Sequence, residues 1–152
     1  MKRPDGSDSH ARLVALAKYT FEARPWTVNE ERRWHHMTRA KRVKEWRESY
    51  GWLGLKTKTR FASAHIVVLI VMKPPVADTG AANGSIKAAI DGLVDAGVLP
   101  GDGPTHVLSL TMLAPIKATK GETEHVTLIL IRGGSNLAED FVPLLDTPNP
   151  TR

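Results

Sequence analysis

The stretch from Phe61 to Met72 constrains the fold more than any other part of this sequence. It ends in the run HIVVLIVM, which is continuous, apolar and rich in β-branched residues. Because it lacks the alternation of a half-exposed strand, the run predicts a central strand covered on both faces. Pro74 and Pro75 then end this strand. The apolar run Ala64–Met72 is also far too short to span a bilayer.

Three further strands are predicted. Tyr19–Glu22 has the composition of a strand, so we place the first strand at Leu16–Glu22, before Pro25. The residues between Trp26 and Trp34 are interpreted as an irregular connection. Two more strands are expected at His106–Leu113 and His125–Arg132, and we interpret them as an antiparallel hairpin.

A long basic helix is predicted over Trp34–Gly51. Its apolar positions recur at helical spacing and should face the core: Met37, Ala40, Val43, Trp46, Tyr50 and Leu53. The three tryptophans Trp34, Trp46 and Trp52 are interpreted as core or staple residues rather than as platforms for stacked bases.

Positive charge is concentrated in and after this helix. One interpretation is an ordinary solvated face. The other is a DNA-binding surface, since contacts of lysine and arginine with phosphates supply most sequence-independent affinity. The ten candidate DNA-binding residues are Arg32, Arg33, Arg39, Lys41, Arg42, Lys44, Arg47, Lys56, Lys58 and Arg60.

A second, amphipathic helix is predicted by Ile86, Ile90, Leu93 and Val94, which recur on one helical face. Ser85 is its candidate N-cap, and Gly97 is expected to end it in a left-handed conformation. Lys87 and Asp91 are one turn apart and share a face. Pro100–Pro104 must form a tight turn that presents Asp102. This turn is either a plain surface turn or part of a metal or acid/base site.

The predicted order is strand, helix, strand, helix, strand, strand. It indicates an α+β fold (mixed α/β) in one domain, with a mixed sheet of about four strands and two main helices. We assign the domain to residues 16–134, a flexible N-terminal segment to residues 1–15, and a C-terminal tail to residues 135–152.

Composition and missing motifs narrow the function. The chain has no cysteine, which excludes disulfides, thiolate–zinc sites and cysteine nucleophiles and fits a reducing cytoplasm. Its formal net charge of +5 favours a polyanionic partner such as nucleic acid. The N-terminus lacks the apolar region of a secretory signal, and no membrane partner is expected. No dinucleotide, Walker or nucleophile-elbow motif occurs, so a small-molecule enzyme has no support.

The histidines do not suggest a metal site by themselves. His35 and His36 are adjacent, so on a helix they point about 100° apart and cannot chelate one ion. His65, His106 and His125 lie in or beside predicted strands, where hydrogen-bonded structural roles are expected.

Three blocks of the sequence resemble the RusA family of Holliday junction resolvases, especially divergent members carried by phages and prophages of actinobacteria. They are NEERRWHHMTRAKRVKEWRE at residues 29–48, KAAIDGLVDAG at residues 87–97, and the turn LPGD at residues 99–102. Val107 follows the turn at the family's spacing. The resemblance covers residues 18–132 in the order typical of the family, and it implies a RusA-like fold.

The resemblance implies a magnesium-dependent endonuclease, with Mn²⁺ as a substitute ion. The enzyme would act on branched or double-stranded DNA as a homodimer in the cytoplasm of a bacterial host. In the family, two aspartates spaced DxD precede the helix, a third follows in the turn, and a lysine of the helix assists. Lys87 matches the lysine, Asp102 matches the turn aspartate, and Asp78 can match the first acid. The implied metal ligands are Asp78 and Asp102, and the implied catalytic residues are Lys87, Asp102 and the supporting carboxylate Asp91.

The match to the family is incomplete. Gly80 stands where the second acid would fall, Ala81 replaces the usual asparagine, and Gly101 replaces the first acid of the turn pair. Mg²⁺ is often held by one or two carboxylates with water and phosphate, so Asp78 and Asp102 suffice if they converge. Two hypotheses follow. One is a working nuclease with a reduced acidic site. The other is a RusA-like fold that has lost catalysis and binds DNA or a protein partner, for example one from the host.

Overall fold

The computed structural model describes residues 16–134. Within them the fold is α+β, with one mixed five-stranded sheet and three helices, as the sequence predicts in outline. The segments assigned to residues 1–15 and 135–152 lie outside the described residues. The elements, in chain order, are β1 (Leu16–Phe21), α2 (Val28–Arg32), α3 (His36–Thr57), β2 (Ala64–Met72), α4 (Asn83–Asp95), β3 (Val107–Met112), β4 (Ile116–Lys117) and β5 (His125–Arg132). Among these helices, none is long and apolar enough to cross a membrane.

The order of the strands in the sheet is β1-β5-β2-β3, and the short β4 extends the β3 edge by pairing with the end of β2. β5 runs antiparallel to both β1 and β2, whereas β3 runs parallel to β2. The predicted hairpin of the last two strands is therefore wrong. β5 carries the fully buried Val126, Leu128 and Leu130. A strand with such buried side chains is more stable in the middle of the sheet, where it pairs on both edges, than at the rim, where it would pair only with β3.

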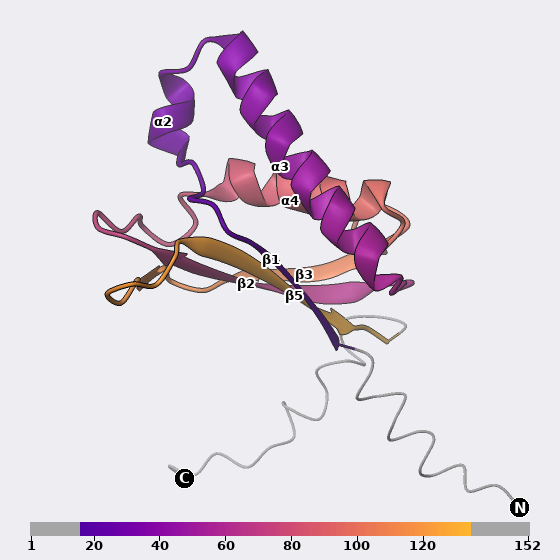
Figure 1. Cartoon of the computed structure of the whole chain (residues 1–152). Coiled ribbons are helices and arrows are strands. Elements are labelled where there is room, and N and C mark those ends of the chain that lie inside the picture. The colour runs from indigo at the N-terminus through magenta and orange to yellow at the C-terminus, as the bar shows by residue number, and fades with distance from the viewer. Residues whose placement is uncertain (1–15, 135–152) are drawn as a thin grey trace, which may run out of the picture.

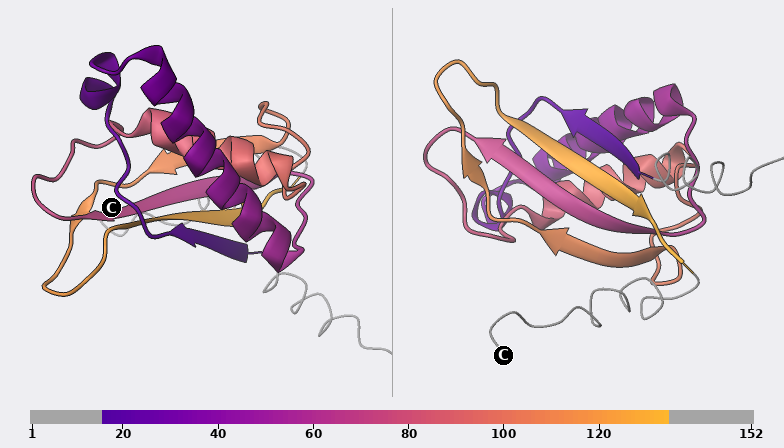
Figure 2. Two further views of the ribbon diagram at one scale, coloured as in Figure 1. Left: turned by 45° about the horizontal axis from the view of Figure 1, so that its top comes forward. Right: turned by 90° about the horizontal axis from the view of Figure 1, so that it is seen from below.

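The two long helices lie on the same side of the sheet (Figure 1). The view from below shows the strands in front of both helices (Figure 2, right). On β2, Ile66, Val68 and Ile70 belong to the core beneath the helices. Of the alternate positions, His65 and Val71 near the strand ends are buried, but Val67 and Leu69 in the middle are only half-buried, because no element of residues 16–134 covers their face. The expectation that the central strand is covered on both faces is therefore wrong.

Aromatic side chains join α3 to the first strand and its connection. Trp46 and Tyr50 are fully buried, as the helical spacing predicts. The Trp46 ring meets Phe21 and Trp26 edge-on, with ring centroids 5.2 and 5.6 Å apart. The Tyr50 hydroxyl donates a hydrogen bond to the Val126 carbonyl at 2.6 Å. This cluster therefore fixes α3 across the centre of the sheet.

Two predictions for α3 and its surroundings need correction. Met37 is 65% exposed and Ala40 is exposed as well, so neither faces the core. Both lie in the first two turns of α3, beyond the part of the helix that packs on α4 and the sheet. The connection expected between Trp26 and Trp34 contains the short helix α2, which begins with a capping box. In this box the Thr27 side chain accepts a hydrogen bond from the Glu30 amide, and the Glu30 carboxylate accepts one from the Thr27 amide.

The helix α4 lies close against α3. A Cβ atom on Gly92 would clash with the Arg47 carbonyl oxygen and lie 2.9 Å from the Gly51 amide nitrogen. Glycine at this point therefore allows the two backbones to cross in contact. Ser85 is not the N-cap that we expected, because α4 already begins at Asn83. Its buried hydroxyl instead donates to the Trp26 carbonyl at 3.0 Å and accepts from the Trp26 amide at 2.9 Å.

Candidate functional site

The carboxylates of Asp91 and Asp102 converge on the ammonium of Lys87. Lys87 Nζ lies 2.8 Å from Asp91 Oδ1 and also contacts Asp102 Oδ2. Lys87 and Asp91 are neighbours on α4, whereas Asp102 belongs to the turn after it. We call these three residues the Lys87 cluster. The Lys87 and Asp102 side chains are 58% and 46% exposed, so the cluster is accessible from solvent.

The end of α4 determines where Asp102 lies. Gly97 adopts a left-handed conformation with φ of 80°, as predicted. The Gly97 amide donates to Val94 and the Val98 amide donates to Leu93, which together form a Schellman motif. Val98 and Leu99 are then fully buried and anchor the start of the turn.

The other end of the turn is held by the edge of the sheet. The Gly103 carbonyl accepts hydrogen bonds from the amides of His106 and Val107, at 3.0 and 2.9 Å. His106 Nδ1 lies 3.0 Å from the Ala62 carbonyl oxygen. The turn is thus fixed on both sides, which places Asp102 opposite Lys87 without support from its own side chain.

The ion pairs change the acid–base properties of the cluster. The hydrogen bond from Lys87 and its positive charge lower the pKa of Asp102 below its ordinary value. The hydrogen bonds with Asp102 and Asp91 raise the pKa of Lys87. With one ammonium and two carboxylates, the cluster has a formal charge of minus one, which favours the approach of a cation.

Asp78 lies in a different place. It precedes α4 in the loop after β2, and its carbonyl accepts a hydrogen bond from the Ala81 amide at 3.0 Å. Its side chain lines a cleft of about 280 Å³, together with Arg24, Asn29 and Glu30. Residues of the Lys87 cluster are not part of this lining. Convergence of Asp78 and Asp102 on one metal ion stays a prediction.

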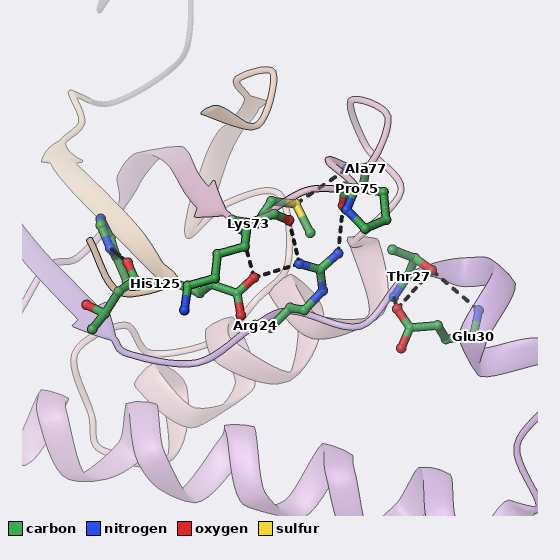
Figure 3. Close-up of polar contacts among 10 residues, drawn as sticks. Arg24, Thr27, Glu30, Lys73, Pro75, Ala77 and His125 are labelled. Atoms are coloured by element: carbon green, nitrogen blue, oxygen red, sulfur yellow. Dashed lines mark hydrogen bonds and ion pairs between the residues drawn. The ribbon is translucent and has the colours of Figure 1, made fainter. Parts of the chain in front are cut away.

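Arg24 holds together the loop that leads to Asp78 (Figure 3). Its guanidinium donates to the carbonyls of Lys73 and Pro75 at 2.8 and 2.7 Å, and to the Glu124 carboxylate at 2.6 Å. Glu124 also accepts a hydrogen bond from the Lys73 amide at 2.9 Å. Sequence reasoning missed this network. The partners of Arg24 lie 49 to 100 residues from it in the chain, so no local pattern could have indicated the network.

The Lys87 cluster has donors of the kind that Mg²⁺ prefers. Mg²⁺ is bound by oxygen atoms and often by only one or two carboxylates, with water and substrate phosphate completing its shell. Within residues 16–134, no group of three or more histidine, aspartate or glutamate side chains is placed to hold a metal ion. Asp91 and Asp102, which meet at Lys87, are two carboxylates of the kind that can hold such an ion together with water and phosphate.

The predicted DNA-binding residues divide into two groups. Four of them form ion pairs with neighbouring acids: Arg39 with Glu31 at 3.2 Å, Arg42 with Glu45 at 3.9 Å, Lys44 with Glu48 at 3.8 Å, and Arg47 with Asp95 at 2.5 Å. The other six lie at the end of α2 or at exposed positions of α3 and the loop after it: Arg32, Arg33, Lys41, Lys56, Lys58 and Arg60. The positive charge of the second group is not balanced by ion pairs with acids among the described residues, so it is more available to a phosphate.

Four histidines make hydrogen bonds within the fold: His35, His65, His106 and His125. His35 Nδ1 accepts from the Met37 amide at 3.2 Å and caps α3. His65 Nδ1 lies 2.7 Å from Ser109 Oγ, which links β2 to β3. His125 Nδ1 lies 2.9 Å from the Thr123 carbonyl. These contacts agree with the structural roles expected for His65, His106 and His125.

Comparison with known families gives no assignment. No protein-family model matches this chain, and no curated protein is significantly similar to it.

Proposed function

We propose that the protein is a magnesium-dependent endonuclease that cuts branched DNA, as its resemblance to the RusA family implies. The observation that supports this most is the Lys87 cluster, in which two carboxylates and one ammonium meet on an accessible surface. Hydrolysis of a phosphodiester needs a place for a divalent ion and positive charge beside the reacting phosphate. The cluster offers both kinds of group.

Each residue of the cluster has a role in this proposal. Asp91 and Asp102 would hold Mg²⁺ or Mn²⁺, which when bound supplies an activated water and stabilises negative charge on the phosphate. The Lys87 ammonium would release the two carboxylates and contact the phosphate instead. There it would stabilise the negative charge that develops in the transition state. The fixed turn keeps Asp102 in position without a folding step on binding. Asp78, in the loop before α4, remains a candidate third ligand.

Basic residues of α3 and its surroundings would hold the DNA. Lys41, Lys56 and Lys58 are exposed, and they belong to the group without an acidic partner among the described residues. Their contacts would be with phosphates and would not depend on base sequence. Recognition of a branch would then come from the shape of the junction.

We also propose that two copies act together, because a four-way junction has two strands to cut. The sheet face that residues 16–134 leave uncovered carries the exposed Leu16, Ile116 and Ile131, which suit contact with a second copy. Sedimentation of the purified chain is expected to give the mass of a dimer. An Ile131→Lys variant should sediment as a monomer, whereas Met37→Lys, at an exposed position of α3, should not change the mass.

The decisive experiment is cleavage of a labelled four-way junction with Mg²⁺ or Mn²⁺, with a gel-shift assay in parallel. Wild-type protein is expected to nick opposite strands symmetrically. Asp102→Asn and Asp91→Asn should abolish nicking, and Lys87→Met should slow it about 100-fold to 1,000-fold, as the loss of one charge-stabilising group does elsewhere. Asp95→Asn is the matched control, since Asp95 lies on α4 but pairs with Arg47.

The position of Asp78 favours a second candidate function. Asp78 lines a cleft whose lining includes no residue of the Lys87 cluster, and among residues 16–134 no three acids are grouped to hold a metal ion. A chain of this kind would bind junctions without cutting them. Junction binding without nicking, whichever metal ion is added, would support this function. If the wild type nicks and the single variant Asp78→Asn does not, the result would support a catalytic role for Asp78. Neither binding nor nicking would contradict both functions and point to a protein partner.

A further inference from the structure

Trp52 differs from the other tryptophans of the chain. Trp26 and Trp46 are fully buried, whereas the Trp52 side chain is 65% exposed on the outer face of α3. Leu55, one turn further along the helix, is 53% exposed. The interpretation of Trp52 as a core or staple residue is therefore wrong in placing its side chain in the core. An exposed aromatic ring next to another apolar side chain is a feature of binding surfaces.

Trp52 stands between two shallow grooves on the surface of α3. The first, of about 500 Å³, is lined by Lys41, Lys44, Glu45, Glu48, Ser49 and Trp52. The second, of about 250 Å³, includes Trp52, Leu55 and the paired Arg47 and Asp95. Trp52 therefore borders both grooves. A flat ligand can lie against it.

The charges around Trp52 favour an anionic ligand. The acids of both grooves are already paired, Glu48 with Lys44, Glu45 with Arg42 and Asp95 with Arg47. Lys41 in the first groove has no acidic partner among the described residues, and Lys56 and Lys58 follow Trp52 along the chain. Lys56 is four residues after Trp52 and so lies on the same face of the helix. The linings of the two grooves carry three basic and three acidic side chains in all, so the excess positive charge beside the ring comes from Lys56 and Lys58. That excess suits a phosphate backbone with accessible bases.

We propose that Trp52 is a stacking platform for an unpaired base of a DNA strand whose phosphates are bound by Lys41, Lys56 and Lys58. This inference rests on the proposed function, because the base pairs at a branch point have to open before a base can reach the ring. A base within a duplex has both faces covered, whereas an unpaired base can stack on an indole ring. Aromatic stacking and neighbouring cations are the usual means of binding single strands without sequence preference.

The test uses the full chain and a fluorescein-labelled 20-nucleotide oligo-dT, with a duplex of the same length for comparison. Trp52→Ala should weaken binding of the single strand about 5-fold to 150-fold, which is the range found for the loss of one stacked base. Trp52→Phe should keep most of the affinity, because it keeps an aromatic face. Met37→Ala is the matched control, since Met37 is equally exposed on α3 but lines neither groove.

A second readout separates stacking from charge. The salt dependence of binding reports phosphate contacts, so it should be unchanged in Trp52→Ala and become weaker in Lys58→Gln. Equal affinity of wild type and Trp52→Ala for the single strand, together with salt-dependent junction binding, would overturn this inference alone. Absence of DNA binding by the wild type would overturn the proposed function as well. A change of sedimenting mass in Trp52→Ala without a change in DNA affinity would assign the ring to a protein contact and overturn the inference.

Discussion

The positive charge of Lys87 affects the titration of the residues around it. The pKa of Asp102 is below its ordinary value of 3.8 because the carboxylate accepts a hydrogen bond from Lys87 and lies beside its charge. Asp102 therefore contributes stability at pH values above about 3.8, which is lost as the pH falls through the lowered pKa. Lys87 has a raised pKa, so its contribution is present below pH 10.5 and is lost as the pH rises through that raised value.

Removing the ammonium should restore the ordinary titration of Asp102. In Lys87→Met, the carboxylate loses its hydrogen-bond donor and the nearby charge, so its pKa should rise toward 3.8. Carbon-13 NMR of the aspartate carboxyl groups measures this directly. Lys44→Met serves as the control, because Lys44 pairs with Glu48 and makes no contact with Asp102. If Asp102 titrates at the same pH in the wild type and in Lys87→Met, the ion pair does not form in solution.

Some site residues could be predicted from local spacing and others could not. Lys87 and Asp91 are four residues apart on a helix, so their pairing follows from the sequence. The contact of Lys87 with Asp102 requires the chain to turn back after Gly97, and the sequence indicates the turn but not its direction. The exposure of Trp52 was predictable from helical spacing, because Trp52 follows the buried Tyr50 by two residues and so lies about 200° from it around the helix.

At the level of elements, the crossing of α3 and α4 depends on the absence of one side chain. The backbone of Arg47 and Gly51 passes directly over Gly92. Elsewhere in a helix, glycine costs up to about 1 kcal/mol relative to alanine, so its use inside α4 has a packing reason. The same contact brings Arg47 to Asp95, where Nη2 lies 2.8 Å from Oδ1.

Gly92→Ala should therefore destabilise the protein, although alanine is the better helix former. The added Cβ would clash with the Arg47 carbonyl and force the helices apart, at a cost of about 1–3 kcal/mol. Gly103→Ala is the matched control, since a Cβ there has no neighbour within 4 Å. Thermal unfolding followed by circular dichroism should show a lower midpoint for Gly92→Ala only. Equal midpoints for the two variants would mean that the helices do not pack this closely.

Elements with strong local patterns agree with their predictions, and the weak ones were missed. The apolar run of β2, the periodic face of α4 and Gly97 beyond its end all have local signals. The helix α2 has only five residues, and its signal, a threonine followed three residues later by glutamate, is easily overlooked. The strand β4 has two residues and no pattern of its own. It forms only because the chain passes the end of β2.

At the level of the whole molecule, strand order is the property that the sequence conveyed least. β3 and β5 follow each other in the chain with a short strand between them, which suggested a hairpin. In the structure β5 instead inserts between β1 and β2, whose residues come from the first half of the chain. Pairing over such distances depends on which apolar faces fit together over α3 and α4. No pattern within one strand carries that information.

Cross-linking can test this order, and the absence of native cysteine makes the result unambiguous. Thr20 of β1 faces Thr127 of β5, with their hydroxyl oxygens 2.7 Å apart. Thr20→Cys with Thr127→Cys should form a disulfide under mild oxidation, because facing residues of adjacent strands lie within the reach of that bond, about 7 Å between Cα atoms.

The control pair combines Thr127→Cys with Thr111→Cys on β3. The strand β2 lies between β3 and β5, so the two positions are at least two strand spacings apart, about 10 Å. This pair should stay reduced, whereas a hairpin of β3 and β5 would bring it together. Mass spectrometry of the oxidised variants, before and after reduction, identifies the linked residues. A disulfide in the control pair but not in the first pair would contradict the strand order, and with it the placement of the Lys87 cluster beside the β3 edge.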